Sequence, residues 1–340
     1  MGNIKFKNAC EGVAQSVPPV WMMRQAGRYH QHYQALRKQH SFIELCKQPD
    51  LAAEVAMGPM EEFDFDVAIL FSDLLFPLEA LGMGLDYNPA PTLGWHLQEV
   101  ADFKKMASID KAISHMQFQG EAVTTTRKRL SDDKSLIGFV GSPWTLFVYA
   151  VAGSHKGSLV EVKKRMGLFP AFCEMIAPLM EANIKIQLDA GAEKVMVFDT
   201  AAGELSAEDF RNHLHPYLVN LSKTYSGQLG YYSKLTVQEH IADLHSKAEF
   251  GGYGYDHRWD LPLQFGQTKG FVQGNFDQNM LFLPEKEFKT YLDQFLEKFK
   301  KLSPDQRKGW VCGLGHGVLP QTPEAHVKYF VQRVREVFSA

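Results

Sequence analysis

The chain has 340 residues, of which 45% are hydrophobic and 22% are charged, and its formal net charge at pH 7 is −3. This composition is typical of a soluble globular protein with a large core, and the length fits a single α/β barrel or two smaller domains. The slightly negative charge provides no overall positive field for nucleic acid, so any anionic ligand must be bound by local arginines.

The first expected element is a buried strand at residues 20–23, an apolar run that is ended by Arg24 and followed by Arg28. A guanidinium at the end of a buried strand either reaches water or binds an anion. If the chain is helical from Gln25 onward, the two arginines share one face and could bind two carboxylates. The alternative is that Arg24 only forms a structural ion pair with a nearby acid.

Seven more runs rich in apolar, β-branched or aromatic residues follow along the chain. They are residues 67–71, 135–140, 194–198, 229–234, 251–255, 270–273 and 309–314. Helical patterns are expected between or after them, at residues 42–63, 170–190, 288–299 and 323–337. Eight strands alternating with helices predict a single (β/α)8 TIM barrel over residues 1–340, with residues 1–18 as an N-terminal extension.

The alternative fold is a doubly wound open sheet. It is disfavoured because no Gly-x-Gly-x-x-Gly motif follows the first strand and no phosphate-binding Gly-x-x-x-x-Gly-Lys motif occurs. The connections are uneven in length, and we expect extra segments such as residues 86–110 to form loops or small helices over one mouth of the barrel.

Polar residues stand at the carboxyl ends of six expected strands, whereas the strand starts carry no comparable set. These ends are Arg24, Ser72-Asp73, residues 141–144, Asp199-Thr200, Gly274-Asn275 and Gly315-His316-Gly317. In a barrel the carboxyl ends of the strands meet at one mouth, where active sites lie. We therefore expect arginine, aspartate, threonine and histidine side chains to line one concave site.

Asp73 lies between two apolar segments, so its carboxylate must be paired, neutralised or directed at a ligand, and a salt bridge to Arg24 is one alternative. His316 has a glycine on each side, which leaves room for a ligand. The pairs His30/His32 and His213/His215 have a spacing that suits a metal only on a strand, and both lie in expected helices or loops. We expect no functional metal.

The four cysteines, at positions 10, 46, 173 and 312, lie far apart and form no Cys-x-x-Cys pair. Residues 1–10 lack an apolar signal-peptide core, and the uncharged stretch 137–153 is short and interrupted by Gly141-Ser142-Pro143. These features predict a cytoplasmic protein with reduced thiols and no membrane contact.

Over residues 19–329 the sequence resembles the uroporphyrinogen decarboxylase family of haem biosynthesis. The motifs that carry the resemblance are Pro-Val-Trp-Met-Met-Arg-Gln-Ala-Gly-Arg-Tyr at 19–29, Ile-Leu-Phe-Ser-Asp-Leu-Leu at 69–75, Gly-Ser-Pro-Trp-Thr-Leu at 141–146, Gly-Asn-Phe-Asp at 274–277 and Leu-Gly-His-Gly at 314–317. The resemblance implies a homodimeric (β/α)8 barrel that removes the four acetate carboxyls of uroporphyrinogen III in steps, giving coproporphyrinogen III, without a cofactor.

By the same resemblance, Arg24, Arg28 and Arg37 would bind substrate carboxylates, and Asp73 would lie under the macrocycle and accept hydrogen bonds from its pyrrole N–H groups. Asp73 and Arg24 would be the catalytic residues.

Tyr149, Thr200 and His316 would contact carboxylates or position the ring. The sequence departs from the family pattern at four places. Residues 30–32 are His-Gln-His where Leu-Pro-Glu is usual, and Ala201 stands where histidine is frequent. Phe276 and Gln278 replace the commoner leucine and proline, and Gly313 replaces an asparagine.

The expected chemistry uses the substrate itself as the electron sink, because protonation of a pyrrole α-carbon creates a cation that accepts the electrons left by carbon dioxide. A carboxylate at Asp73 would stabilise that cation. Arg24 is a poor acid, so a water or a substrate carboxyl could supply the proton. Two alternatives remain. One is a corrinoid methyltransferase-like barrel, which would need a His-x-Cys zinc motif that this sequence lacks, and the other is a non-catalytic tetrapyrrole-binding protein.

Overall fold

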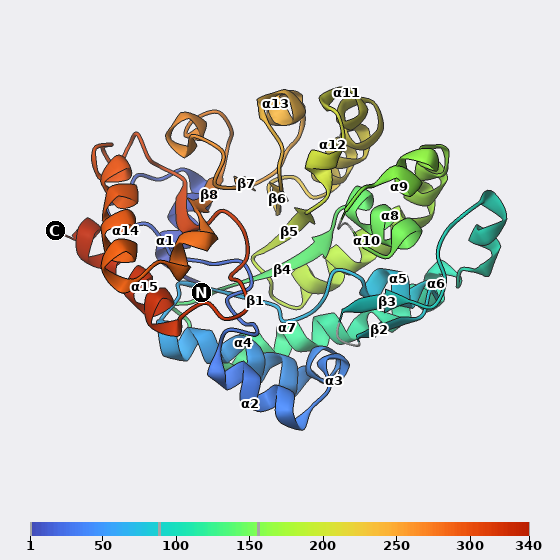
Figure 1. The fold of residues 1–340 in the computed structure, drawn as a ribbon, viewed down its shortest axis with the longest axis horizontal. Coiled ribbons are helices and arrows are strands. Elements are labelled where there is room, and N and C mark those ends of the chain that lie inside the picture. The colour runs from blue at the N-terminus through green and yellow to red at the C-terminus, as the bar shows by residue number, and fades with distance from the viewer. Residues whose placement is uncertain (1, 88–89, 155–156, 340) are drawn as a thin grey trace.

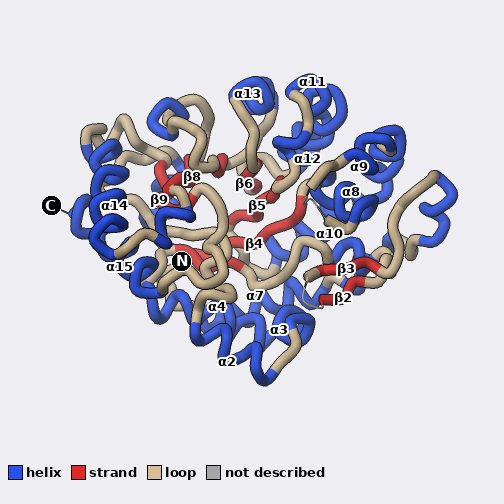
Figure 2. Tube along the Cα trace, in the orientation of Figure 1, coloured by secondary structure: helices blue, strands red, loops and turns tan. Residues whose placement is uncertain are grey.

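The computed structural model describes residues 2–87, 90–154 and 157–339, and its centre is a curled sheet of parallel strands in the order β1-β4-β5-β6-β7-β8-β9. These strands are β1 (Val67–Ile69), β4 (Ser135–Gly141), β5 (Lys194–Asp199), β6 (Leu229–Ser233), β7 (Gly252–Gly254), β8 (Phe271–Phe276) and β9 (Trp310–Leu314). Each strand pairs with the next strand of this order, and Figure 2 shows the strands enclosed by helices. The barrel architecture expected from the sequence is therefore present.

The helices surround the strands and form the outer layer of the barrel (Figure 1). They are α1 (Ile4–Glu11), α2 (Gln31–Gln39), α3 (Phe42–Lys47), α4 (Pro49–Phe63), α5 (Phe76–Ala80), α6 (Ile109–His115), α7 (Gln117–Arg129), α8 (Pro143–Ala152), α9 (Val160–Lys164), α10 (Phe169–Asp189), α11 (Ala207–Asp209), α12 (His215–Thr224), α13 (Gln238–Lys247), α14 (Glu285–Lys300) and α15 (Glu324–Ser339). Within the described ranges, no helix is both long enough and apolar enough to cross a membrane.

The segment around Val20 closes the barrel between β9 and β1. Val20 forms an isolated parallel bridge with Cys312, and the Trp21 N–H donates to the Cys312 carbonyl at 3.1 Å. On the other side, the Asp66 N–H donates to the Val20 carbonyl at 3.1 Å. The strand expected at residues 20–23 is thus reduced to one bridge, because Pro19 has no N–H to donate and the backbone turns at Arg24, where φ is +61°.

Helix α1 covers the amino ends of the strands. The Asn3 side chain caps this helix by accepting from Lys5 N and Phe6 N, and the Asn3 N–H donates to Ser135 Oγ at the start of β4. The Phe6 ring lies 6.0 Å from the ring of Phe271, the first residue of β8. Residues before the first strand therefore close one end of the barrel, so any deep site must open at the carboxyl ends of the strands.

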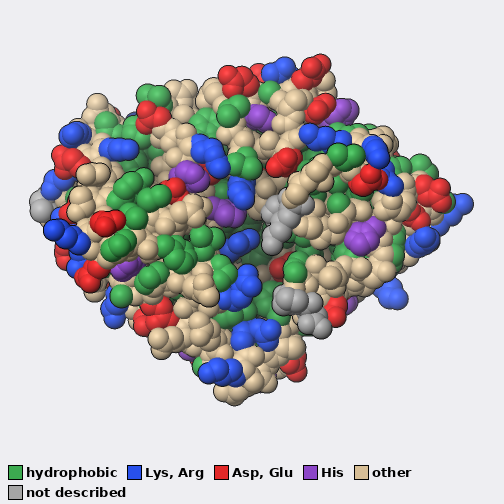
Figure 3. Space-filling view, in the orientation of Figure 1, with side chains coloured by type: hydrophobic (Ala, Val, Ile, Leu, Met, Phe, Trp, Pro, Cys, Tyr) green, Lys and Arg blue, Asp and Glu red, His purple; other side chains and the backbone are tan. Residues whose placement is uncertain are grey.

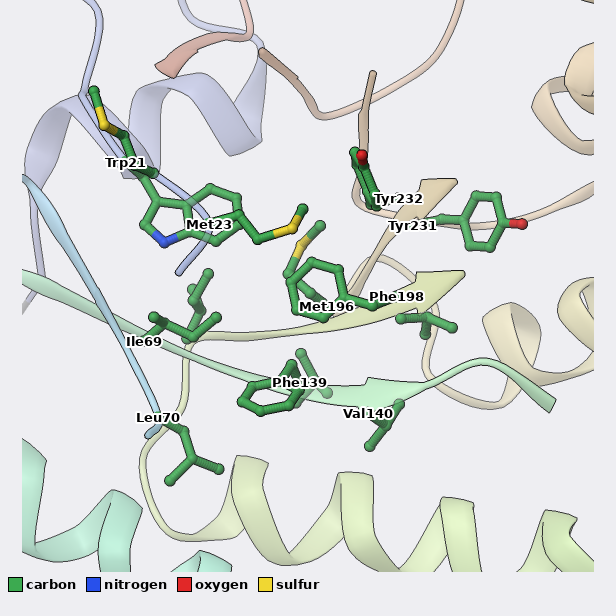
Figure 4. Packing of buried hydrophobic residues seen from close by; sticks show 14 of the residues in the cluster. Trp21, Met23, Ile69, Leu70, Phe139, Val140, Met196, Phe198, Tyr231 and Tyr232 are labelled. Atoms are coloured by element: carbon green, nitrogen blue, oxygen red, sulfur yellow. The ribbon is translucent and has the colours of Figure 1, made fainter. Parts of the chain in front are cut away.

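The barrel interior is filled by large apolar side chains from successive strands. Figure 4 shows Met23, Ile69, Phe139 and Phe198 extending into the space enclosed by the strands. The same figure shows Tyr231 and Tyr232 leaving β6 in different directions. This follows from the two-residue period of a strand, which places neighbouring side chains on opposite faces.

Two expected elements differ from the structure. The helix expected at residues 42–63 is divided into α3 and α4, because Pro49 has no N–H to continue α3 and instead occupies the first turn of α4. The segment expected as loops or small helices contains an antiparallel hairpin, formed by β2 (Leu85–Tyr87) and β3 (Pro91–Leu93). Strands of three residues are too short to show a clear alternation in the sequence.

Candidate functional site

The carboxyl ends of the barrel strands surround a hollow near the middle of the face shown in Figure 3. Hydrophobic side chains are visible deep in this hollow, and several Lys or Arg side chains lie along its rim. Four apolar residues that lie in strands or shortly after them retain 5–8% exposure, namely Met23, Phe71, Phe139 and Phe198, whereas Met196, two residues before Phe198 on β5, has 1%. The site therefore has an apolar floor and a basic rim.

Arg24 lies at this mouth and contacts the loop after β9. A Cβ added to Gly317 would come within 2.4 Å of Arg24 Cδ, so the arginine side chain passes directly over the glycine. The Val318 N–H donates to the Met23 carbonyl at 2.9 Å and holds the two loops together. Arg24 is exposed, and residues 23–29 contain turns and bends but no helix, so the condition for Arg24 and Arg28 to share a helical face is not met.

The three arginines expected to bind carboxylates are all exposed, and in the described chain none of them forms an ion pair with an acid. Seven other arginines do form such pairs: Arg127, Arg129, Arg165, Arg211, Arg258, Arg333 and Arg335. Arg37 is on α2 and donates to the His40 carbonyl at 2.5 Å. The guanidinium groups of Arg24, Arg28 and Arg37 are therefore not neutralised by neighbouring carboxylates.

Asp73 follows β1 and is partly exposed. Its Oδ1 accepts from the Leu75 N–H at 2.9 Å, and no ion pair within 4.0 Å involves it in the described chain. The salt bridge to Arg24 considered above is thus not formed. Burial raises the pKa of Asp73, while the Leu75 N–H, Tyr87 and the charge of Arg24 oppose the shift. The positive charge of Arg24 therefore lowers the pKa of the Asp73 carboxyl, but the two groups do not form an ion pair.

Two tyrosine side chains lie near the Asp73 carboxylate. Burial raises the pKa of Tyr149, on α8, to about 12, with a further rise from Asp73 and an opposing effect of Arg24. Tyr87, at the end of β2, also has a raised pKa because of burial and then of Asp73. The buried Tyr87 hydroxyl is directed at the Asp73 carboxylate and opposes the rise in its pKa, without meeting the full geometry of a hydrogen bond. Both hydroxyls therefore remain protonated.

His316 is partly exposed after β9 and is held by Tyr232 of β6. The Tyr232 hydroxyl lies 2.8 Å from the Gly315 carbonyl oxygen and 3.0 Å from His316 Nδ1. The two rings are stacked, with centroids 6.0 Å apart. Burial raises the pKa of Tyr232, as does Asp256, whereas Arg24 and Arg258 lower it. Arg24 and His316 are therefore both neighbours of the same tyrosine.

The end of β5 carries two polar residues that point in different directions. Thr200 keeps 8% exposure, whereas Asp199 is fully buried and accepts from Thr145 Oγ1 at 2.8 Å and from the Tyr231 hydroxyl at 3.2 Å. Burial raises the pKa of Asp199 to about 6, and these hydrogen bonds oppose the rise. The expectation that Asp199 lines the hollow is wrong, because its carboxylate lies between the sheet and α8.

Residues 141–144 were also expected at the concave site, but they stabilise α8 instead. The Ser142 side chain accepts from the Thr145 N–H and caps this helix, and Trp144 Nε1 donates to the Ala201 carbonyl at 2.9 Å. Asn275 likewise donates to the backbone carbonyls of Asp256 and Trp259. Polar residues at strand ends thus serve both the site and the loops around it.

Tyr232, Tyr87 and Arg258 were not among the residues expected at the mouth. Tyr232 lies near the end of β6 and Arg258 in the loop after β7, two strands at whose ends no polar group was expected. Tyr232 could have been found from the sequence. A tyrosine near the end of a buried strand needs a hydrogen-bond partner for its hydroxyl, and such a partner is available at the mouth of the barrel. Arg258 donates to Asp256 Oδ2 at 2.9 Å and remains 49% exposed. Tyr87 could not be found without knowledge of the β2–β3 hairpin.

The thiols do not suit thiolate chemistry. Burial raises the pKa of Cys10 to about 12, and it also raises the pKa values of Cys46, Cys173 and Cys312. Among residues that the structure describes, no three His, Cys, Asp or Glu side chains are grouped as metal ligands. The polar groups at the mouth are therefore suited to binding charge and hydrogen-bond donors rather than to nucleophilic attack by sulfur.

Comparisons with known proteins show the family of the chain. The sequence model of the family described as "Uroporphyrinogen decarboxylase (URO-D)" matches residues 1–337. A uroporphyrinogen decarboxylase of Pelobacter propionicus is 34% identical, covering 98% of this chain and 99% of the relative. One of Helicobacter pylori is 36% identical, with 97% and 98% coverage, and one of Carboxydothermus hydrogenoformans is 33% identical, with 99% and 97%.

Solved structures show the same fold at lower sequence identity. A methyltransferase from Methanosarcina mazei has a TM-score of 0.76 at 19% identity, and the match covers 99% of this chain and 98% of that one. A putative vitamin-B12-independent methionine synthase from Listeria monocytogenes has a TM-score of 0.55 at 13% identity, with 95% and 98% coverage. At these identities the likeness concerns the barrel alone.

Proposed function

Because the chain belongs to the uroporphyrinogen decarboxylase family, we propose that the hollow at the carboxyl ends of its strands binds uroporphyrinogen III and is where the acetate carboxyls leave. The protein is a carboxy-lyase, and its activity is the decarboxylation of uroporphyrinogen. The finer proposal is that all four acetates are removed in steps at this one site, without a cofactor, to give coproporphyrinogen III.

One observation carries the proposal: Arg24 and Asp73 lie at the same mouth without forming an ion pair. An arginine and an aspartate with purely structural roles at the same mouth would gain by pairing. Charges held apart are instead suited to a ligand that carries both acidic arms and N–H donors. Uroporphyrinogen is such a ligand, since carboxylated side chains surround a ring of four pyrroles.

Arg24, Arg28 and Arg37 are proposed to bind the carboxylates. Each charge-assisted hydrogen bond contributes about 1.5–3 kcal/mol net, so a few of them hold a polyanion although the whole chain is slightly negative. The apolar floor formed by Met23, Phe71, Phe139 and Phe198 would lie below the macrocycle. Because this apolar surface excludes water, it lowers the local dielectric constant and strengthens the nearby interactions between charges.

Asp73 is proposed as the electrostatic catalyst. Protonation of a pyrrole α-carbon places positive charge on the ring, and an adjacent carboxylate stabilises that charge as it develops. Burial raises the pKa of Asp73 in the absence of ligand. Pyrrole N–H donors favour the ionised carboxylate, so substrate binding is expected to shift this pKa downward and to produce the charge that the reaction needs.

The remaining proposed contacts are Tyr149, Thr200 and His316, which lie around the same mouth and would bind carboxylates or position the ring. Arg24 would act through its charge rather than as an acid, because guanidinium groups do not deprotonate in proteins. We infer that the proton for the α-carbon comes from a bound water or from a substrate carboxyl.

We also propose that the protein is a single-domain enzyme that works in the cytoplasm as a homodimer. The support is the family resemblance, together with the reduced state expected of four widely spaced cysteines. Light scattering coupled to size-exclusion chromatography tests the dimer, and a mass of one chain at working concentration would contradict it.

The decisive experiment is incubation of the protein with uroporphyrinogen III under reducing conditions, with the loss of each carboxyl followed by mass spectrometry. The expected result is stepwise loss down to coproporphyrinogen III by the wild type and little loss by Asp73→Asn. Asp189→Asn is the matched control, since Asp189 pairs with Lys185 on the outer surface of α10. Bound coproporphyrin without any turnover would support the non-catalytic tetrapyrrole-binding alternative instead.

A further inference from the structure

The Tyr232 hydroxyl contacts two atoms of the loop after β9 but carries only one proton. It lies 2.8 Å from the Gly315 carbonyl oxygen and 3.0 Å from His316 Nδ1. The raised pKa of Tyr232, caused mainly by burial, keeps that proton on the oxygen. The hydroxyl can therefore donate a hydrogen bond to only one of these two atoms, and the other atom must donate a hydrogen bond to the hydroxyl oxygen.

The contact with the Gly315 carbonyl decides which of the two atoms accepts the hydrogen bond from Tyr232. A carbonyl oxygen has no hydrogen to donate, so an O···O distance of 2.8 Å is attractive only if the tyrosine proton lies between the two oxygens. The hydroxyl oxygen then offers its lone pairs to His316 Nδ1. A contact of 3.0 Å is a hydrogen bond in that case only if Nδ1 carries a hydrogen.

We propose that Tyr232 is a positioning residue that holds the neutral His316 ring in its Nδ1–H tautomer. The stacked rings, at an interplanar angle of 16°, fix the plane of the imidazole, and the hydrogen bond fixes which nitrogen carries the proton. The Nε2–H form of a histidine side chain is the more populated one in water. Tyr232 therefore imposes the less common form.

The consequence for the site concerns Nε2, which lies on the opposite side of the imidazole from Tyr232. In the Nδ1–H tautomer Nε2 carries a lone pair, so the neutral ring accepts a hydrogen bond there, and any proton that the ring gains is placed on Nε2. A substrate carboxyl in its acid form would be bound by the neutral ring, and a carboxylate by the protonated one. This consequence rests on the proposed contact between His316 and substrate, whereas the tautomer itself does not.

The test is nuclear magnetic resonance of full-length protein labelled with 15N-histidine, without substrate, at a pH where the imidazole is neutral. Long-range 1H–15N correlations distinguish a protonated ring nitrogen from an unprotonated one, and the signals of His316 are those absent from His316→Gln. The wild type is expected to show a protonated Nδ1 and an unprotonated Nε2. A wild-type spectrum with the proton on Nε2 would overturn the proposal without any variant having to fold.

Tyr232→Phe keeps the ring and removes only the hydroxyl. Its spectrum is expected to show the Nε2–H form or a mixture of both tautomers, and its kcat/KM is expected to fall about tenfold, as for the loss of one hydrogen bond. Tyr231→Phe is the matched control, because its hydroxyl donates to Asp199 behind the sheet, and the His316 tautomer should not change.

An unchanged tautomer in Tyr232→Phe would contradict the proposal. If the spectra behave as expected but the wild type does not decarboxylate uroporphyrinogen, the proposed function fails while the assignment of Tyr232 stands.

Discussion

The side chain of Arg24 crosses Gly317 so closely that a Cβ on the glycine would lie 2.4 Å from Arg24 Cδ and 2.7 Å from Cγ. Gly317 does not have a left-handed backbone conformation, so the absence of a side chain here provides clearance rather than backbone freedom. Nearly the whole chain separates the two residues in sequence. The contact places the Arg24 side chain against the loop that carries His316, and the charge of Arg24 lowers the pKa of Asp73.

Gly317→Ala should therefore act on Arg24. The flexible arginine arm must move away from the new methyl group, so the KM for uroporphyrinogen is expected to rise about tenfold or more, toward that of Arg24→Ala. The melting temperature should change little, since Arg24 is exposed. Gly167→Ala is the control, because nothing lies within 4 Å of a Cβ at Gly167. An unchanged KM in Gly317→Ala would contradict this prediction, because the Arg24 side chain would then move without weakening substrate binding.

Asp73→Asn should remove most of the activity and keep the fold. Asparagine retains the acceptor for the Leu75 N–H but cannot supply a negative charge to a developing cation. We expect kcat to fall by about 10²-fold or more, the range seen when one preorganised electrostatic group is removed. Steady-state kinetics and circular dichroism on the same preparation measure both quantities. Substantial formation of coproporphyrinogen by this variant would refute the role of Asp73.

The same substitution should stabilise the protein at neutral pH. Burial raises the pKa of Asp73 in the folded state, so between the unfolded and folded pKa values the folded chain binds more protons than the unfolded chain. The free energy of unfolding of the wild type therefore falls as pH rises through that window, and the whole penalty is present above the folded pKa.

Asp73→Asn has no such penalty, so its melting temperature should exceed that of the wild type near pH 7.5, and the difference should vanish below the ordinary carboxyl range. Thermal melts at several pH values provide the measurement. A variant that is less stable at pH 7.5 would mean that the ionised carboxylate has a stabilising partner.

The unpaired arginines predict a strong dependence on salt. Raising the ionic strength from about 0.05 M to about 0.5 M should increase the KM for uroporphyrinogen much more than it changes kcat, because screening weakens attraction between exposed charges. Arg28→Gln and Arg37→Gln should each increase KM at low salt and make it less sensitive to salt. Arg129→Gln is the control, since Arg129 is already paired with Asp50 and Glu54. A KM independent of salt in the wild type would argue against carboxylate binding at this rim.

Asp66 holds the closure of the barrel, and its loss should reduce stability more than a surface substitution does. Its Oδ2 accepts from the Val20 N–H at 2.7 Å, and its Oδ1 pairs with Lys5 at 2.5 Å and accepts from Asn3 Nδ2. Asp66→Asn is expected to cost about 2–4 kcal/mol in the free energy of unfolding, because a buried charge network is broken. Asp189→Asn should cost about 0.5 kcal/mol or less. Urea titration of both variants checks the difference.

Much of the fold could be predicted from the sequence, because a parallel strand buried on both faces must be a short apolar run. Seven of the eight expected strands coincide with β1 and β4 to β9 within a few residues. The eighth failed for a local reason, since the proline at position 19 cannot donate to a ladder and the chain turns at Arg24. The division between α3 and α4 follows from Pro49 in the same way.

The position of the hollow could also be predicted from the sequence, since polar residues at the carboxyl ends of parallel strands must share one mouth of a barrel. Which side chains face the hollow could not be predicted from the sequence. Asp199 and Thr200 are neighbours, yet only Thr200 stays on the side of the hollow, because a two-residue period puts them on opposite faces.

In a strand that is apolar on both faces, the sequence does not reveal which face is interior. Whether an arginine is paired or unpaired depends on a distance of a few ångströms between segments that are remote in the chain. Composition and spacing thus determined the barrel and the mouth, and only the tertiary structure decided that Arg24 lies unpaired across Gly317 while Arg258 is paired with Asp256.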